Sequence, residues 1–335
     1  MRTLYRAAIA ITAFALRLAA RLNPKLRQAI NGRRTLWRTT EEHYETVAAS
    51  RKKIIIHVAS FGELEQATPL IEKLKADDPA IHIHLTFFSP SGYENAIGKY
   101  TTPDLITYLP FDTLKNVRCF LDLTKPDQFI FIRYDVWHTL ADELSARKIG
   151  SILVCATVNE KKFRNPFTRV LYRTTYQNLD RILTIGQSDK LALVRLGIDE
   201  KKMSVSGDTR FDQVITRKNE VLTKNENILP MTFADKMVLI AGSTWEADEA
   251  LLKQLVDNSS IGVRLVSILV PHEVSPGHIT SLSEQYGKRA ILFSQIHNYN
   301  GESVVIVDTI GKLFALYQYA DIAYVGGGFG AGVHN

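Results

Sequence analysis

The feature of this sequence that most constrains its fold is a repeated alternation of apolar, β-branched runs with segments of helical periodicity. The first run, residues 54–59, is followed by Ser60-Phe61-Gly62-Glu63 and then by a helical pattern over residues 64–75. Alternation of this kind specifies a parallel sheet with helices on both faces. Further strands are expected at residues 81–88, 105–109, 129–132, 151–155, 181–184 and 204–205, and helices at 113–123, 137–147, 166–177 and 188–196.

A second block restarts the alternation after a polar segment, residues 217–232, that lacks a strong period. Strands are predicted at residues 237–241, 265–270, 290–293, 304–307 and 322–325, with a helix from Asp248. The sequence therefore predicts two doubly wound α/β domains, residues 39–216 and 233–335, joined by a linker at 217–232 and facing a cleft. Because ligands of open parallel sheets bind outside the carboxyl ends of the strands, functional residues are expected directly after strands.

The N-terminal segment, residues 1–38, has a charge unlike that of the rest of the chain. It carries nine of the 41 basic side chains and no acidic one, which leaves 32 basic and 35 acidic side chains elsewhere. The rest of the chain therefore has a slightly negative net charge, which argues against nucleic-acid binding, because that function needs a basic face. The two cysteines, Cys119 and Cys155, exclude a disulfide framework and are expected in the core.

The same segment predicts an amphipathic helix. The apolar run over residues 7–16 is too short to span a bilayer, which takes about 20 residues. On a helical wheel the arginines share one arc, and the apolar side chains lie beside it. This is typical of a helix in a membrane interface whose arginines reach anionic headgroups, and the lack of acidic residues favours it over the alternative, a helix packed on the body. The arginines are Arg2, Arg6, Arg17 and Arg21, and the apolar residues are Leu4, Ala7, Ile11, Phe14, Leu18 and Leu22.

Three charged residues that follow predicted strands could carry chemistry. Glu63 opens a helix and could act as a general base, or merely complement the helix dipole. Asp135, within Arg133-Tyr134-Asp135-Val136-Trp137, adds a carboxylate to the same sheet edge. Arg210, within residues 207–212, could pair with a phosphate or carboxylate ligand, or form an ordinary surface pair with a neighbouring aspartate.

The loops of the second block suit an anionic ligand. Five glycines within residues 326–332 follow the last strand, where backbone N–H groups can approach a phosphate or a sugar; the alternative is a flexible tail. Pro271-His272 also follows a strand, as a ligand contact or as a cap. The sequence holds no catalytic triad, Walker A motif or zinc-ligand spacing.

Together and in this order, these motifs resemble the lipid A Kdo transferases (3-deoxy-D-manno-octulosonic acid transferases), which are glycosyltransferases of the GT-B fold. The resemblance implies two Rossmann-like domains behind an N-terminal amphipathic helix, CMP-Kdo as donor and a lipid A precursor as acceptor in lipopolysaccharide core biosynthesis. It further implies action at the cytoplasmic face of the bacterial inner membrane, an anionic surface reached through residues 1–38, and no metal or cofactor. The segments that carry it are residues 59–63, 109–112, 135–137, 207–212, 241–245, 271–272 and 326–335.

Carried over residue by residue, the resemblance implies roles for individual side chains. Glu63 would be the general base that deprotonates the acceptor hydroxyl in an inverting displacement, and Asp135 and Arg210 would stabilise the transition state. The donor would be bound by residues of the second domain. These are Pro271, His272, Ile310, Gly311, Lys312, Gly327, Gly328 and Asn335.

The sequence departs from the family at several of these positions. The family more often has Glu-x-Glu-Leu-Trp at residues 133–137, so Arg133 inverts a sign, and it often has Lys at position 210, Arg at 272 and Glu at 312. Asn335 would begin an Asn-x-Leu-Glu motif whose Leu-Glu is absent from the chain, so the second domain is expected to be incomplete. Two other hypotheses are a nucleotide-sugar epimerase or hydrolase of the same fold, and a non-catalytic membrane-binding fragment without a complete donor site.

Overall fold

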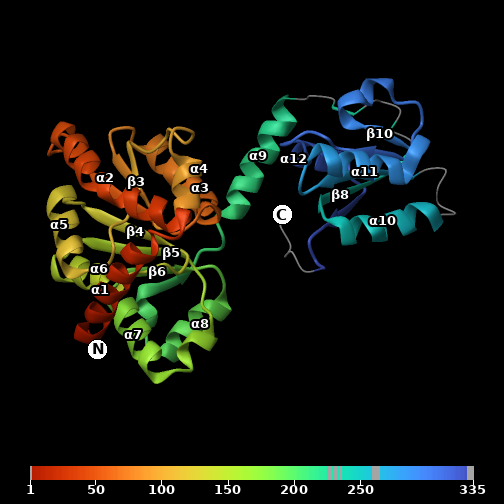
Figure 1. Cartoon of the computed structure of the whole chain (residues 1–335). Helices are drawn as coiled ribbons and strands as arrows, with labels where there is room; N and C mark the ends of the chain where they lie inside the picture. The colour runs from red at the N-terminus through yellow and green to blue at the C-terminus, as the bar shows by residue number, and fades with distance from the viewer. Residues whose placement is uncertain (1, 225–227, 230–232, 234–235, 259–264, 330–335) are drawn as a thin grey trace. The chain divides into compact units, whose positions relative to one another are not determined.

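The computed structural model describes residues 2–224, 228–229, 233, 236–258 and 265–329 and divides into two compact units, Met1–Thr216 (unit 1) and Arg217–Asn335 (unit 2) (Figure 1). Helix α9 (Arg210–Lys224) runs from the first into the second. Unit 1 contains α1 (Arg2–Ala19), α2 (Pro24–Thr46), β1 (Lys53–Val58), α3 (Phe61–Asp77), β2 (His82–Phe87), α4 (Pro90–Ala96), β3 (Leu105–Tyr108), α5 (Leu114–Thr124), β4 (Gln128–Ile132), α6 (His138–Ala146), β5 (Gly150–Ala156), η1 (Glu160–Phe163), α7 (Pro166–Gln177), β6 (Arg181–Thr184), α8 (Gln187–Leu196), η2 (Glu200–Lys202) and β7 (Met203–Val205). Unit 2 contains β8 (Met237–Thr244), α10 (Glu246–Asn258), β9 (Leu265–Pro271), α11 (Pro276–Tyr286), η4 (Gly287–Arg289), β10 (Ala290–Leu292), η5 (Phe293–Asn298), β11 (Val304–Ile306), α12 (Leu313–Leu316), η6 (Tyr317–Tyr319) and β12 (Ile322–Val325).

The sheet of unit 1 has seven parallel strands in the order β3-β2-β1-β4-β5-β6-β7. Strand β1 lies between β2 and β4, with Ile54 opposite both Ile83 and Gln128. The chain builds outward from β1 in one direction as far as β3 and then returns to β4 on the other side. The gap between the carboxyl ends of β1 and β4 is therefore the topological switch point at which ligands of such sheets bind.

Both faces of this sheet are buried, as the β-branched runs predict. Ile55, Phe129 and Phe131 pack on one face against α2, α5 and α6, whereas Ile54 and Ile56 pack on the other against α3 and α4. Because successive strand residues point to opposite faces, the unbroken apolar run Ile54-Ile55-Ile56 supplies both layers. The predicted parallel α/β fold is confirmed for this unit.

Unit 2 repeats the pattern with five parallel strands in the order β10-β11-β9-β8-β12. Its switch point lies between β8 and β12, which pair in parallel from Leu239 opposite Ile322 to Gly242 opposite Val325. Gly326 follows directly, and its N–H donates to the carbonyl of Gly242. A Cβ at Gly326 would overlap the Ser243 backbone, so this close approach requires glycine.

The basic N-terminal segment forms two helices, and the expected boundary at residue 38 falls inside the second. Helix α2 packs on β3 and α5 as part of unit 1, with Leu36 in the core. Arg33 is buried, where it donates to the carbonyls of Leu109 and Phe88 and lies 5.0 Å from the Tyr108 ring centroid. Helix α2 is therefore packed on the body of unit 1, as the alternative interpretation of this segment predicted. The prediction of membrane contact then concerns α1 alone.

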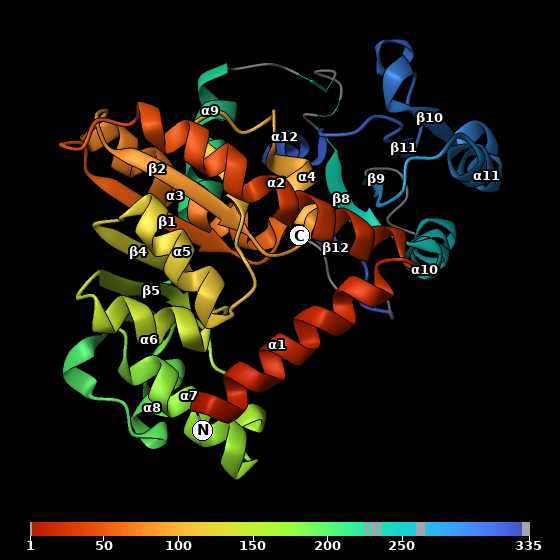
Figure 2. The same cartoon turned by 60° about the vertical axis from the view of Figure 1, so that its left-hand side comes forward.

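Helix α1 carries its apolar side chains outward. Ile11 and Phe14 are 69% and 62% exposed, while its N-terminal end lies beside α6 and α7 (Figure 2). There Arg2 and Arg6 lie 3.1 Å and 3.5 Å from the carboxylate of Asp142. These two arginines, which were expected to reach lipid headgroups, therefore pair with a carboxylate of unit 1, and the Arg2 side chain remains 64% exposed. Within the described residues, no helix is long and apolar enough to cross a membrane.

Several local expectations are also corrected. The expected linker at 217–232 is helical as far as Lys224, because α9 continues through its first residues. Strand β8 extends through residues 242–244, beyond its expected end at residue 241. Cys119 is exposed on α5, whereas Cys155 is buried as expected. Gly62 lies in the first turn of α3 with open space around it and without a positive φ, so neither packing nor backbone conformation requires glycine there.

The packing of α2 yields a first prediction, because Gly32 is the point at which this helix approaches β3 most closely. A Cβ at Gly32 would overlap the ring of Tyr108, which is almost fully buried. Gly32→Ala should therefore lower the free energy of unfolding by about 1–3 kcal/mol, as overpacking does. Gly62→Ala is the matched control, since nothing lies near its Cβ, and it should be neutral or stabilising by up to about 1 kcal/mol. Urea unfolding followed by circular dichroism measures both; a Gly32→Ala protein as stable as the parent would contradict this packing.

Candidate functional site

The switch point of unit 1 brings two predicted site residues to one edge. Strands β1 and β4 are neighbours and end at Val58 and Ile132. The segment after β1 enters α3 and sets Glu63 in its first turn, while the segment after β4 carries Asp135 toward α6. The two carboxylates that the sequence placed at one sheet edge therefore do lie at the same edge.

Glu63 is a buried carboxyl with an altered proton affinity. The residue is 1% exposed, and its Oε2 accepts a hydrogen bond from the N–H of Ala59. Burial is the main cause that raises the pKa of Glu63; Asp135 also raises it, while the Ala59 bond and the charges of His57 and Arg133 act in the opposite direction. A carboxylate with a raised pKa is a better proton acceptor than an ordinary glutamate, as a general base requires.

Asp135 is held by two donors on one oxygen. Its Oδ2 lies 3.1 Å from His57 Nε2 and 3.2 Å from Trp137 Nε1. Because a carboxylate only accepts, Nε2 of His57 carries a proton in this contact. The other ring nitrogen, Nδ1, lies 3.0 Å from Thr86 Oγ1 on β2. The imidazole thus bridges a neighbouring strand and the carboxylate and fixes the direction of Asp135.

Sequence reasoning missed His57. The residue is 0% exposed inside β1, and it is the one polar side chain of the run Ile54–Val58. A polar residue within an apolar strand buried on both faces needs a hydrogen-bonding partner. The sequence therefore indicates that His57 has a partner. It does not show which residue that is, because the partner depends on which strands are neighbours in the sheet.

The backbone after β4 is strained at Arg133. This residue has φ 71°, its N–H donates to the carbonyl of Val154 at 2.8 Å, and its own carbonyl accepts from Thr157 N–H at 3.3 Å. Cys155, at the end of the adjacent β5, has φ 54°. Non-glycine residues held in this region cluster at functional sites.

Arg210, the first residue of α9, is already paired with an aspartate. Its Nε and Nη2 lie 2.9 Å and 2.6 Å from Asp208 Oδ2, and Asp208 Oδ1 accepts from Gln66 Nε2 at 3.0 Å. Burial opposes ionisation of Asp208, yet the bonds from Arg210 and Gln66 lower its pKa overall. The Arg210 side chain remains 52% exposed. Among the described contacts, none joins Arg210 to Glu63 or Asp135, so the structure shows the aspartate pair that the sequence left as an alternative.

The predicted donor-binding residues belong to unit 2. Pro271 ends β9, and His272 stacks on Trp245 with ring centroids 4.7 Å apart and an interplanar angle of 23°. Ile310 and Gly311, the latter with φ 82°, precede Lys312 at the start of α12, and Ile310 is 88% exposed. Asn335 lies outside the described residues.

The glycine loop meets a carboxylate of its own unit. The N–H of Gly327 and that of Trp245 both donate to Asp248 Oδ2 at 2.9 Å, and the Tyr324 hydroxyl donates to Oδ1 at 2.7 Å. Burial opposes ionisation of Asp248, but these three hydrogen bonds lower its pKa overall. A cavity of about 280 Å³ opens beside this cluster. No role was assigned to Asp248 from the sequence. Its carboxylate thus accepts from the Gly327 N–H, one of the backbone groups expected to bind a phosphate. At Gly328, by contrast, no atom lies near the position that a Cβ would take.

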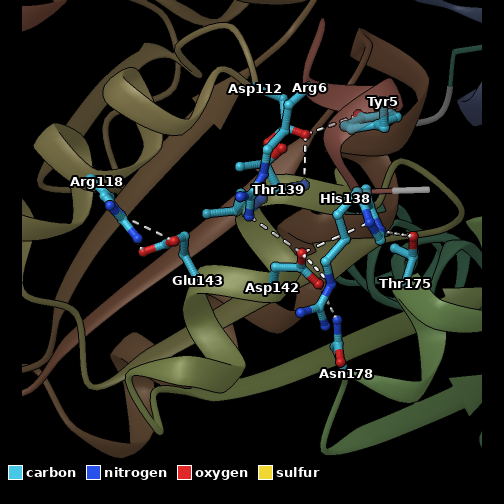
Figure 3. Close-up of polar contacts among 12 residues, drawn as sticks. Tyr5, Arg6, Asp112, Arg118, His138, Thr139, Asp142, Glu143, Thr175 and Asn178 are labelled. Atoms are coloured by element: carbon cyan, nitrogen blue, oxygen red, sulfur yellow. Dashed lines mark hydrogen bonds and ion pairs between the residues drawn. The ribbon is translucent and has the colours of Figure 1, made fainter. Parts of the chain in front are cut away.

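The motif at residues 109–112 has a structural role through Asp112, whose contacts Figure 3 shows. Asp112 accepts from the N–H groups of Thr139 and Leu140 at 2.8 Å and 2.9 Å, and from the Tyr5 hydroxyl of α1 at 2.9 Å. Burial raises the pKa of Asp112 to about 7, although these hydrogen bonds lower it in part. The motif therefore caps the first turn of α6 and attaches α1 to it.

In the part of the chain that the structure describes, no group of three or more His, Cys, Asp or Glu side chains could hold a metal ion.

Comparison with known proteins gives a family and a fold. Residues 32–213, more than half of the chain, match the family model described as 3-deoxy-D-manno-octulosonic-acid transferase (kdotransferase). A 3-deoxy-D-manno-octulosonic acid transferase of Haemophilus influenzae is 26% identical over 281 residues, which cover 82% of this chain and 65% of that protein. The corresponding transferase of Aquifex aeolicus is 26% identical over 298 residues, covering 87% and 74%. A bifunctional glycosyltransferase/methyltransferase of Fusobacterium nucleatum is 25% identical, with only 43% of its length covered, so the chain spans less than two thirds of some of these relatives.

Solved structures of low sequence identity share the fold. A UDP-GlcNAc 2-epimerase from Neisseria meningitidis superposes with a TM-score of 0.54 at 12% identity, covering 81% of this chain and 76% of that one. The UDP-GlcNAc 2-epimerase of Methanocaldococcus jannaschii gives 0.51 at 17% identity, covering 82% and 77%. At such identity the likeness carries the fold alone, and it confirms the predicted α/β class with two Rossmann-like units of the GT-B type.

Proposed function

The chain belongs to the 3-deoxy-D-manno-octulosonic-acid transferase (Kdo transferase) family, and from that premise we propose that it transfers Kdo from CMP-Kdo to a lipid A precursor in lipopolysaccharide core biosynthesis. The observation that carries the proposal is the pair Glu63 and Asp135 at the switch point of unit 1, inside the region matched by the family. The family resemblance supplies the identity of the donor and of the acceptor, and it implies a reaction without a metal or a cofactor.

The proposed step is a single displacement. Glu63 takes the proton from an acceptor hydroxyl, and the oxygen forms a bond to the ketosidic carbon of Kdo. The bond from that carbon to the phosphate oxygen breaks, and CMP leaves with the electron pair, which inverts the configuration. Asp135, directed by His57 and Trp137, stabilises the cationic character that develops on the sugar.

The departing phosphate gains negative charge. The half-exposed guanidinium of Arg210 in unit 1 is proposed to stabilise that charge. In unit 2 the proposed nucleotide contacts are Pro271 and His272 at the end of β9, with Gly327 and Gly328 after β12. Ile310, Gly311 and Lys312 before α12 complete the described set, and the family assigns Asn335 to the same nucleotide.

Replacing the proposed base by its amide tests this mechanism. Glu63→Gln in the complete protein keeps an oxygen for the Ala59 N–H but removes the proton acceptor. The rate of Kdo transfer, measured as CMP release with the lipid acceptor, should fall by about 10²–10⁴-fold. In the unaltered protein the rate should fall on acidification through the raised pKa of Glu63, at a pH above the ordinary range of a glutamate.

The matched control is Glu72→Gln, an exposed glutamate on the same helix, which should transfer at the normal rate. A normal rate in Glu63→Gln would remove Glu63 from the role of base. Turnover of a nucleotide sugar without any acceptor would favour the epimerase or hydrolase hypothesis instead. Absence of CMP binding by calorimetry would favour the non-catalytic fragment.

We also propose that α1 attaches unit 1 to the cytoplasmic face of the bacterial inner membrane. Its polar side chains Arg2 and Tyr5 contact the body, which leaves the apolar side chains outward where they can enter the headgroup boundary. Arg17 and Arg34 line a cavity of about 330 Å³ next to this helix, where the phosphate of an anionic lipid can bind.

Removing the apolar side chains of α1 tests the attachment. The triple substitution Ile11→Ser, Phe14→Ser and Leu18→Ser should lower flotation with anionic liposomes about tenfold or more, because the apolar area that enters the membrane is lost. The double substitution Phe167→Ser and Val170→Ser on α7 also removes exposed apolar side chains and should leave flotation unchanged. Equal loss in both proteins, or loss in neither, would contradict α1 as the attachment site.

A further inference from the structure

A cavity of about 310 Å³ opens at the sheet edge of unit 1, next to the segment that carries Asp135. Its wall combines two cations with aromatic rings, and it includes Arg133, Tyr134, Lys162, Phe163, Tyr172 and Tyr176. These residues come from the segment after β4, from η1 and from α7. Burial, Tyr172 and Asp135 together raise the pKa of Tyr176, which places this wall within electrostatic reach of Asp135.

The two cations of this cavity gather on one aromatic ring. Arg133 Cζ and Lys162 Nζ each lie 5.2 Å from the centroid of the Tyr134 ring. Among the described contacts of the chain, no ion pair joins either cation to a carboxylate. Two like charges beside one ring repel each other, so an anion between them would be attracted by both.

The guanidinium of Arg133 is also incompletely hydrogen-bonded. Its Nε is buried and has no hydrogen-bond partner. Other arginines of unit 1 contrast with it: Arg51 lies 2.7 Å from Asp104, and Arg147 lies 2.7 Å from Asp122. A buried donor without a partner is costly, and a ligand oxygen can satisfy it.

The backbone holds Arg133 in place for such a contact. The residue keeps φ 71° because its N–H is fixed to Val154 in β5 and its carbonyl to Thr157, which directly follows that strand. Strain of this kind persists only where the surrounding structure imposes it.

We infer that this cavity binds a phosphomonoester carried on a sugar ring, with Arg133 and Lys162 on the phosphate and the aromatic side chains against the apolar face of the sugar. Guanidinium groups match phosphate oxygens in geometry, and a sugar ring packs on aromatic faces through its C–H groups. The identity of the ligand as part of the acceptor rests on the proposed function, because the two residues directly before Asp135 line the cavity. The cavity would then select the acceptor through the phosphate group that the acceptor carries.

The test is a calorimetric measurement of binding to the full chain in the absence of donor. The three ligands compared are α-D-glucosamine 1-phosphate, glucosamine and inorganic phosphate. The sugar phosphate should bind saturably and at least tenfold more tightly than glucosamine or inorganic phosphate. Lys162→Gln and Arg133→Gln should each weaken it fivefold or more, whereas Lys161→Gln, an exposed neighbour that does not line the cavity, should not change it.

Because Lys162 is exposed, its substitution leaves the fold intact and keeps the test valid even if Arg133→Gln is poorly folded. Equal binding of glucosamine and the sugar phosphate, or of inorganic phosphate and the sugar phosphate, would overturn the inference. So would an unchanged affinity in Lys162→Gln. Kdo transfer without sugar-phosphate binding would refute this inference alone, and sugar-phosphate binding without Kdo transfer would refute the proposed function alone.

Discussion

The structure of unit 1 depends on two carboxylates, the buried Glu63 and the partly exposed Asp135, that lie at the switch point between β1 and β4. Bringing them to one edge is unfavourable, because burial and the neighbouring charge of Asp135 both oppose the charged form of Glu63. The fold supplies hydrogen-bond donors to both carboxylates: the Ala59 N–H donates to Glu63, and His57 and Trp137 donate to one oxygen of Asp135. The strand order decides this arrangement, since it makes β1 and β4 neighbours and turns both of their ends toward the same edge.

The same edge is tied to the N-terminal helices through the start of α6. Asp112 accepts from the first N–H groups of α6, which begins directly after the segment with Asp135 and Trp137. The Tyr5 hydroxyl of α1 donates to the same carboxylate, on the oxygen that also accepts from the Thr139 N–H. The capping of α6 therefore fixes the segment that holds Asp135 and attaches the helix proposed to lie on the membrane. Through this one aspartate, the proposed membrane contact and the proposed chemistry share a support.

The sequence was a good guide to what local periodicity determines. The strands of both sheets fall close to their expected places, and α7 coincides with the predicted helix 166–177, because Asn165 and Pro166 mark its start. Glu63 and Asp135 could be placed at one edge because each follows a strand. Long-range pairing could not be seen in the same way: nothing local shows that His57 meets Asp135, that Gly32 lets α2 approach Tyr108, or that Asp248 occupies the Gly327 amide.

The central claim is that Glu63 is a proton acceptor whose affinity is set by burial and by its neighbour Asp135. Titration of the ¹³C-labelled side-chain carboxyl of Glu63 by NMR, in the unaltered protein and in Asp135→Asn, tests it most directly. The account predicts a Glu63 pKa above that of an ordinary glutamate, and a lower value once the Asp135 charge is removed. A Glu63 that titrates in the ordinary range, or that does not respond to Asp135→Asn, would contradict it.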